Sequence, residues 1–203
     1  MTTYLQIGTN VAHDWFFELV KKNNPGRIVL VEPFEANFES IHNCYKDYNY
    51  ELIEGIIHGE KDEENESIFL PDNNINRTCH ATLEPMKDWG IENLKPITVK
   101  AYNFNTICEK LNIDEIEFLC IDTEGYDNVI INSIDFAKIQ INNIITEKWG
   151  FSADVYDKDN PLLGLPGQEI IKEKLLKHNY IREDFCSGES GNTSDDFIFK
   201  LKL

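Results

Sequence analysis

The chain of 203 residues is poor in basic side chains, with 19 lysines and arginines against 36 aspartates and glutamates. The formal net charge is −17. Because proteins bind nucleic acid largely through Lys and Arg at the phosphates, this balance disfavours a nucleic-acid partner. No apolar run approaches membrane-spanning length, and the first residues, MTTYLQIG, enter an apolar segment without the pattern of a signal peptide. We therefore expect a cytoplasmic protein with no membrane partner.

Cysteine is also scarce. The chain has five cysteines, Cys44, Cys79, Cys108, Cys120 and Cys186, and no Cys-x-x-Cys pair. An odd number without paired spacing argues against both a disulfide framework and a cysteine-based zinc site. Reduced cysteines without a ligand role are the expected state.

The glycine pattern G-x-G-x-x-G of dinucleotide-binding turns is missing, which argues against an NAD enzyme. Residues 4–10 read YLQIGTN, a strand pattern that ends at Gly8 and precedes a helix pattern over 12–23. A second strand pattern over 27–32 ends at Glu32, 24 residues after Gly8. At about this spacing, an acidic residue on the second strand reaches the ribose hydroxyls of an adenosine cofactor.

Residues 117–127, EFLCIDTEGYD, are the most informative stretch. An apolar run stops at Asp122 and Glu124, as in open α/β sheets that bind ligands at the carboxyl ends of their strands. The alternative is a simple helix start, with Asp or Thr as the N-cap and an acidic first turn.

Strand and helix patterns alternate through the first half of the chain, which predicts an α/β fold with a mostly parallel sheet. The near-continuous apolar strands at 28–31, 118–121 and 143–146 indicate a sheet covered on both faces. We predict seven strands, at 3–8, 27–32, 51–57, 116–121, 141–147, 179–185 and 196–202. Ten residues separate the last two strands, so this pair should be antiparallel.

The sequence predicts one domain over residues 1–203, with an insert or lid at about 59–101. The acidic run 60–66 reads as a solvated loop, and 67–70 and 97–101 as extra strands. Residues 72–92 read as a mobile lid or substrate loop, and 152–166 as a second polar loop.

Four segments then occur in a characteristic order: QIGTN, VEPFEANFESI, the strand Leu52–His58 before an acidic turn, and CIDTEGYDNVIINSI. Together they resemble the FkbM-type methyltransferases over about residues 4–147. The resemblance implies a Rossmann-like class I methyltransferase fold, with a seven-stranded, mostly parallel sheet and an antiparallel last strand. It also implies S-adenosylmethionine as cofactor and a hydroxyl oxygen of a small-molecule or carbohydrate acceptor as the usual target.

By the same resemblance, Gly8, Thr9 and Asn10 should face the methionine part of the cofactor, and Glu32 should hold its ribose hydroxyls. The family usually has an acidic residue where this chain has Gln6. An amide can still bind the cofactor's ammonium, but without the strength that a carboxylate's charge adds. Gln6 therefore counts as a weaker cofactor-binding residue.

The resemblance further places Ile57 and His58, at the end of the third strand, near the adenine. Asp122 and Glu124 should lie beside the sulfonium and the acceptor, as cofactor-binding and catalytic groups.

The acceptor hydroxyl must lose a proton, and two schemes are open. Asp122 and Glu147 end strands that are neighbours in this topology, and such carboxylates suit Mg²⁺ as a second cofactor. Glu147 could equally pair with Lys148 or Arg27. Alternatively His13, early in the first helix pattern, is a general base, since a helix N-terminus depresses the pKa of a histidine.

Two other function classes compete with the methyltransferase hypothesis. A non-catalytic binding module that retains the fold is motivated by Gln6, and an enzyme with another adenosine cofactor is opposed by the missing glycine pattern. The sequence identifies neither the acceptor nor the oligomeric state.

Overall fold

The computed structural model describes residues 1–71, 94–123, 126–147, 165–185 and 196–202. Seven strands form the main sheet in the order β3-β2-β1-β7-β8-β10-β9. They are β1 Thr3–Ile7, β2 Arg27–Glu32, β3 Tyr50–Glu54, β7 Glu115–Ile121, β8 Gln140–Glu147, β9 Tyr180–Phe185 and β10 Asp196–Leu201. All neighbours are parallel except β10, which runs antiparallel to both β8 and β9. This is the predicted sheet, with its antiparallel last strand confirmed.

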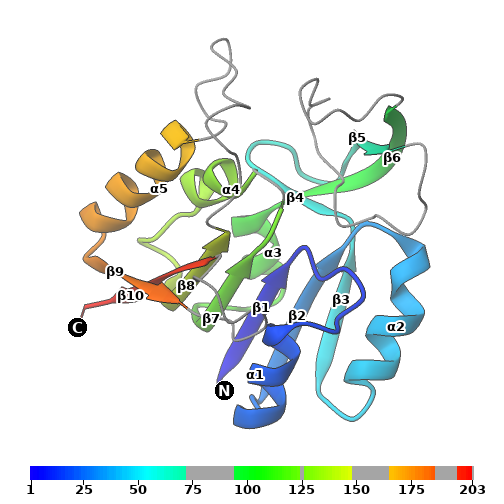
Figure 1. Cartoon of the computed structure of the whole chain (residues 1–203), viewed down its shortest axis with the longest axis horizontal. Helices are drawn as coiled ribbons and strands as arrows, with labels where there is room; N and C mark the ends of the chain where they lie inside the picture. The colour runs from blue at the N-terminus through cyan, green and yellow to red at the C-terminus, as the bar shows by residue number, and fades with distance from the viewer. Residues whose placement is uncertain (72–93, 124–125, 148–164, 186–195, 203) are drawn as a thin grey trace.

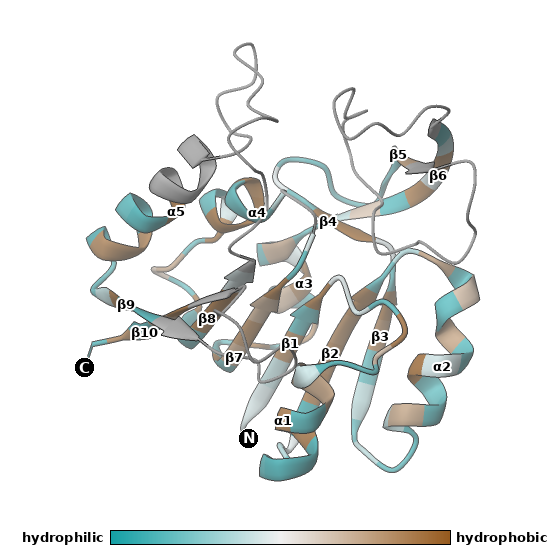
Figure 2. Ribbon diagram, viewed as in Figure 1, coloured by the Kyte–Doolittle hydropathy of each residue, from teal (hydrophilic) through white to brown (hydrophobic). Residues whose placement is uncertain are grey.

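In the described part of the chain, helices cover the two faces of this sheet (Figure 1): α1 Trp15–Asn23, α2 Glu35–Tyr45, α3 Phe104–Lys110, α4 Asp127–Ser133 and α5 Leu165–Lys177. Buried side chains of α1 and α2 pack with Tyr4, Ile28 and Leu30 on one face. Buried side chains of α3, α4 and α5 pack on the other face. The central strands are apolar along most of their length (Figure 2), as expected for a sheet sandwiched between helices.

A second sheet has the order β4-β6-β5, with β4 Ile56–His58, β5 Glu64–Pro71 and β6 Leu94–Asn103. The predicted third strand, 51–57, is therefore wrong in extent, because β3 ends at Glu54 and β4 pairs with β6 instead. Gly55 marks the break: a Cβ there would lie 2.4 Å from the carbonyl oxygen of Lys100. Only a residue without a side chain lets the chain leave one sheet for the other this close to β6.

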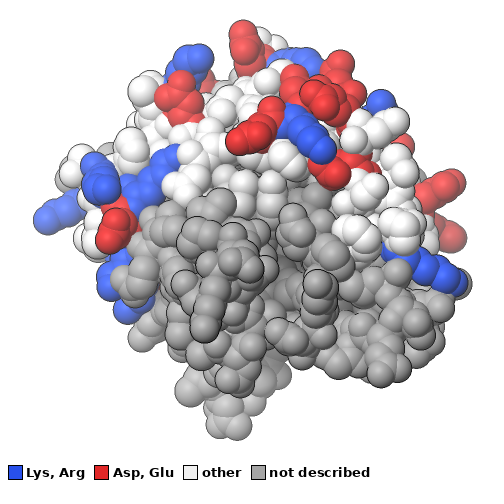
Figure 3. All heavy atoms as spheres, turned by 90° about the horizontal axis from the view of Figure 1, so that it is seen from above, with Lys and Arg blue, Asp and Glu red and all other residues white. Residues whose placement is uncertain are grey.

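The extra strands expected at 67–70 and 97–101 are present in β5 and β6 and are longer than predicted. The acidic run is only partly a loop, since β5 begins at Glu64, and Glu66 pairs with Lys61. Viewed from above, acidic and basic side chains lie side by side on the described surface (Figure 3).

The predicted lid or substrate loop, 72–92, lies outside the described residues, as does most of the predicted polar loop 152–166, whose last two residues belong to α5. The single domain over 1–203 with an insert at about 59–101 therefore stays a prediction. Among the described residues, no helix is long and apolar enough to cross a membrane. Within the described residues, Cys44, Cys108 and Cys120 form no disulfide.

Candidate active site

The carboxyl ends of β1, β2 and β7 meet where the order of the sheet reverses. The chain runs outward from β1 through β2 to β3 and returns to β7 on the other side of β1. Such a switch point is where open α/β sheets bind ligands. Backbone hydrogen bonds hold the three tips together, since the amide of Gly8 donates to Val31 (3.1 Å) and that of Asp122 donates to Ile7 (3.0 Å).

Gly8 is required here for packing. Its φ is +85°, and a Cβ on it would lie 1.9 Å from the carbonyl oxygen of Asp122. The resemblance predicts that Gly8 faces the cofactor, and the structure shows that its missing side chain lets the turn pack against the backbone at the end of β7. The turn at the end of β1 is thereby fixed directly above the Asp122 backbone.

The loop that follows Gly8 is bent by residues in left-handed conformations. Asn10 has φ 50° and Ala12 has φ 61°, both unusual for residues with a side chain. Thr9 is buried, and its hydroxyl donates to the Val31 carbonyl (3.3 Å). This geometry turns the chain back over β2 and delays α1, which begins at Trp15 rather than near residue 12 as predicted.

Glu32 lies under this loop with only 2% of its surface exposed. Its Oε2 accepts a hydrogen bond from the amide of Asn10 (2.7 Å). Its Oε1 accepts from the amide of Phe34 (3.0 Å) and from the side chain of Asn37 (2.9 Å). Burial raises the pKa of this carboxyl group from 4.5 to about 7, although the three donors act in the opposite direction.

Gln6 lies on the same face of the sheet as Glu32. It is two residues after Tyr4 along β1, and Tyr4 belongs to the core under α1 and α2. The side chain of Gln6 is 2% exposed, and its Nε2 donates to Oδ2 of Asp14 at 2.6 Å. Its Oε1 is buried and has no hydrogen-bond partner in the described part of the chain. An unpaired buried acceptor costs about 1–3 kcal/mol, so this oxygen marks a place where a donor is missing.

Asp122 follows β7 on that same side, two residues after Cys120 of the α1 and α2 core. Asp122 is an exposed residue, yet the surrounding protein replaces part of the water around its carboxyl group. This desolvation, together with the negative charge of Asp14, raises the pKa of Asp122 above its ordinary value.

The alternative, in which Asp or Thr is the N-cap of the following helix, is wrong, because the N-cap of α4 is Tyr126 and its side chain forms no capping hydrogen bond. The amide and hydroxyl of Thr123 both donate to Oδ1 of Asp127, at 3.1 and 2.5 Å. Asp127, the first residue of α4, thus fixes the turn that leads into the helix. Asp122 takes no part in it, and no described residue forms a hydrogen bond with its side chain.

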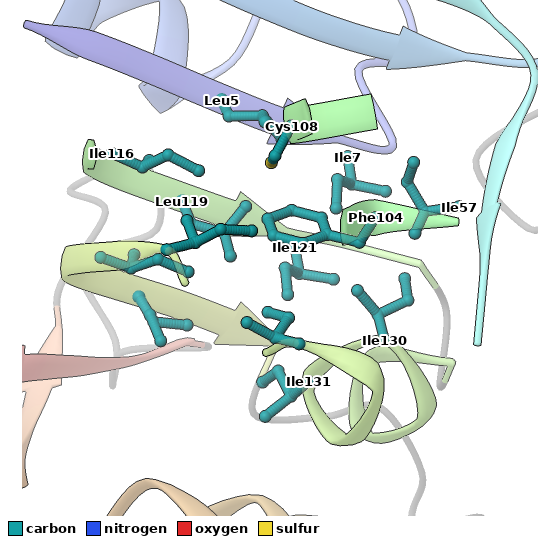
Figure 4. Packing of buried hydrophobic residues seen from close by; sticks show 14 of the residues in the cluster. Leu5, Ile7, Ile57, Phe104, Cys108, Ile116, Leu119, Ile121, Ile130 and Ile131 are labelled. Atoms are coloured by element: carbon teal, nitrogen blue, oxygen red, sulfur yellow. The ribbon is translucent and has the colours of Figure 1, made fainter. Parts of the chain in front are cut away.

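Ile57 belongs to the second sheet and not to the end of the third strand. Its side chain is 2% exposed and packs in the core on the α3 and α4 side, near Phe104 and Ile121 (Figure 4). This is the face opposite Gln6 and Glu32. Contact with an adenine ring stays a prediction, and the packing already accounts for the apolar character of Ile57.

His58 stabilises the turn after β4. Its Nδ1 accepts hydrogen bonds from the amides of Glu60 (3.0 Å) and Lys61 (3.1 Å), which requires an unprotonated Nδ1. Desolvation lowers the pKa of His58, against the opposing charge of Glu66. The ring also lies 5.7 Å from that of Tyr126, centroid to centroid. Its predicted place beside the adenine is not tested by these contacts.

His13 is exposed, and its ring nitrogens lie 3.7 and 3.8 Å from the sulfur of Cys44 in the last turn of α2. The structure thus brings this predicted base to α2, and shows no contact between it and Asp122. Its role as the base stays a prediction. Glu124, the second predicted catalytic carboxylate, lies outside the described residues.

The strand adjacency behind the metal prediction is correct, because β7 and β8 are parallel neighbours with Ile121 opposite Thr146. Asp122 and Glu147 are therefore the next backbone positions on adjacent strands. The side chain of Glu147 is not described. Within the described residues, no group of three or more His, Cys, Asp or Glu side chains could hold a metal ion.

The family model for the methyltransferase FkbM domain matches residues 6–180 of the chain. The chain belongs to the FkbM methyltransferase family. It is accordingly an S-adenosylmethionine-dependent methyltransferase. This finding favours the methyltransferase hypothesis over a non-catalytic binding module and over an NAD enzyme. Comparison with curated proteins finds no match.

Two solved structures similar to this FkbM methyltransferase are themselves methyltransferases. One is the precorrin-6y C5,15-methyltransferase of Geobacter metallireducens, with 15% identity and a TM-score of 0.46 over 99% of this chain and 80% of that one. The other is the methyltransferase domain of the bacterial protein CtHen1, with 8% identity and a TM-score of 0.45 over 98% of this chain and 90% of that one.

The sequence analysis did not identify two residues of the candidate site of this FkbM methyltransferase. Asp14 binds Gln6 across eight residues, and Asn37 binds Glu32 from α2 while also lying 3.4 Å from the side-chain oxygen of Asn10. Asp14 carried a signal, because an aspartate just before an apolar helix pattern is a typical N-cap. Asn37 carried none, since nothing in the sequence says that its amide turns inward.

Proposed function

We propose that this FkbM methyltransferase methylates a hydroxyl oxygen of a small or sugar-like acceptor. The observation that supports this most is the position of Asp122 at the switch point, as an exposed residue whose carboxyl group has a raised pKa. A proton acceptor works best when its pKa lies near the working pH, and a hydroxyl is the acceptor type that needs such a group.

The residues at the strand tips fit the cofactor chemically. The ammonium at its methionine end requires acceptors, and Gln6 presents a buried carbonyl oxygen without a donor. The ribose hydroxyls can donate to a carboxylate, and Oε2 of Glu32 holds one hydrogen bond and can accept another, whereas Oε1 already holds two. When bound, S-adenosylmethionine supplies a methyl group on a positively charged sulfur.

In this proposal Asp122 orients the acceptor hydroxyl and takes its proton at a carboxylate oxygen. The backbone of Asp122 is locked by Ile7 and by the close packing of Gly8. A fixed base contributes by holding the reacting oxygen in place as well as by removing its proton. Chelation of Mg²⁺ and the variants Glu147→Gln and His13→Ala distinguish whether a metal at Asp122 and Glu147, or His13, assists the removal of this proton.

The test is a screen that detects S-adenosylhomocysteine release with matched acceptors, in which sugars and small alcohols are paired with their amino and thiol analogues. We expect turnover with a subset of hydroxyl compounds and its loss in Asp122→Asn. Turnover with the amines or thiols but with none of the matched hydroxyl compounds would overturn the O-methylation proposal.

A further inference from the structure

The first motif of this chain has Gln6 where the family usually has a carboxylate on β1. In the structure a carboxylate from another residue, Asp14, lies beside Gln6. Asp14 reaches back to the strand, where its Oδ2 accepts a hydrogen bond from Gln6 at 2.6 Å. The loop that makes this contact possible contains the left-handed residues Asn10 and Ala12. Residue 14 thus lies beside residue 6, although eight positions separate them.

The carboxylate of Asp14 is held in a fixed orientation. Its Oδ1 accepts the amide hydrogen of Phe17 at 3.0 Å, as the N-cap of α1. Two hydrogen bonds leave lone pairs on both oxygens, because a carboxylate offers about four acceptor sites. The side chain is only half-buried, so these sites are open to a ligand.

Two further hydrogen-bond acceptors lie close to Asp14. One is the buried Oε1 of Gln6, which has no hydrogen-bond partner among the described residues. The other is the carboxylate of Asp122, whose pKa is raised in part by the charge of Asp14. Among the described residues, neither Asp14 nor Asp122 forms an ion pair with Lys, Arg or His. Two carboxylates without an ion pair, beside an acceptor oxygen without a donor, fit a positively charged ligand with several N–H groups.

We propose that Asp14, together with Gln6, binds the α-ammonium group at the methionine end of the cofactor. This inference rests on the cofactor assignment made above. In this chain the N-cap residue of α1, Asp14, carries the negative charge that the family usually has on β1. Gln6 holds Asp14 in position through its side-chain nitrogen, and its side-chain oxygen accepts a hydrogen bond from the ammonium. Gln6 is then half of a two-residue site, and its lack of charge is offset by Asp14.

Asp14→Asn is the decisive variant, because asparagine caps helices about as well as aspartate and lacks the charge. Calorimetry should use two probes: S-adenosylhomocysteine, and S-adenosyl-4-thiobutyric acid, which lacks only the α-amino group. We expect Asp14→Asn to weaken binding of the first about tenfold or more, as loss of a charge-assisted hydrogen bond does, and to leave binding of the second unchanged.

The charge swap Gln6→Glu with Asp14→Asn supplies an independent readout. It returns the carboxylate to β1 and puts the amide at position 14, so it should recover most of the affinity that Asp14→Asn loses. A purely structural role of Asp14 predicts no such recovery. Should Asp14→Asn not fold, Asp14→Ser keeps the helix cap and removes the same charge.

The outcomes separate this inference from the proposed cofactor. No binding of S-adenosylhomocysteine to the wild-type protein would overturn both. Wild-type binding that Asp14→Asn leaves unchanged, or weakens equally for the two probes, would overturn the ammonium site alone and leave Asp14 as a helix cap.

Discussion

Replacing Glu32 by glutamine should change how the stability of the protein depends on pH. Glu32 is almost fully buried, and its pKa rises from 4.5 to about 7 in the folded state. Between these values the folded protein holds a proton on Glu32 that the unfolded chain has lost. The free energy of unfolding therefore decreases as the pH rises, until Glu32 is ionised in both states.

The magnitude follows from the shift. A single group with these two pKa values contributes about 2 kcal/mol more stability at pH 5.5 than at pH 8.5. That range stays above the isoelectric point of about 4.6. Glutamine has nearly the same shape and does not titrate, so the difference between the wild-type and Glu32→Gln free energies isolates this contribution.

Urea unfolding of both proteins at several pH values measures that difference. We expect the wild type to lose stability relative to Glu32→Gln by about 2 kcal/mol from pH 5.5 to pH 8.5. Two parallel stability profiles would refute the reasoning. They would show that the donors from Asn10, Phe34 and Asn37 outweigh burial and keep Glu32 ionised throughout this pH range.

Three further predictions concern the strand tips. Gly8→Ala should destabilise the fold by about 2–4 kcal/mol in urea unfolding, because the new Cβ meets the Asp122 carbonyl at a positive φ; Gly59→Ala, whose Cβ meets a methyl group of Val129, is the control, and equal losses would contradict the packing argument. Asp122→Asn should lower the turnover number about 100-fold or more while changing the calorimetric affinity for S-adenosylhomocysteine far less, and near wild-type turnover would remove Asp122 from the mechanism. If Asp122 and Glu147 hold Mg²⁺, a chelator should stop methyl transfer, added Mg²⁺ should restore it, and Glu147→Gln should act like the chelator; transfer that survives both treatments but is lost in His13→Ala would favour the histidine instead.

Much of the main sheet was predictable because its pattern is local. The apolar runs at 28–31 and 118–121 can be buried only in a sheet covered on both faces, and the structure buries them there, with Phe118 partly buried. The split of the third strand was not predictable in this way. It depends on the approach of Gly55 to the Lys100 carbonyl, and that contact joins residues 45 positions apart.

The candidate site shows the same division. Gly8, Glu32 and Asp122 could be identified because each stands where an apolar run ends, and the sheet brings such ends together. The bond between Gln6 and Asp14 could not, since it depends on left-handed residues at positions 10 and 12 that carry no glycine signature. Sequence reasoning consequently treated Gln6 as an isolated weak point.

A crystal structure of the protein with S-adenosylhomocysteine tests the central claim most directly. The account predicts that the ligand lies across the carboxyl ends of β1, β2 and β7, with its ribose hydroxyls at Glu32 and its methionine end at Gln6. Failure of the ligand to bind at saturating concentration, or binding away from these three strand ends, would contradict it.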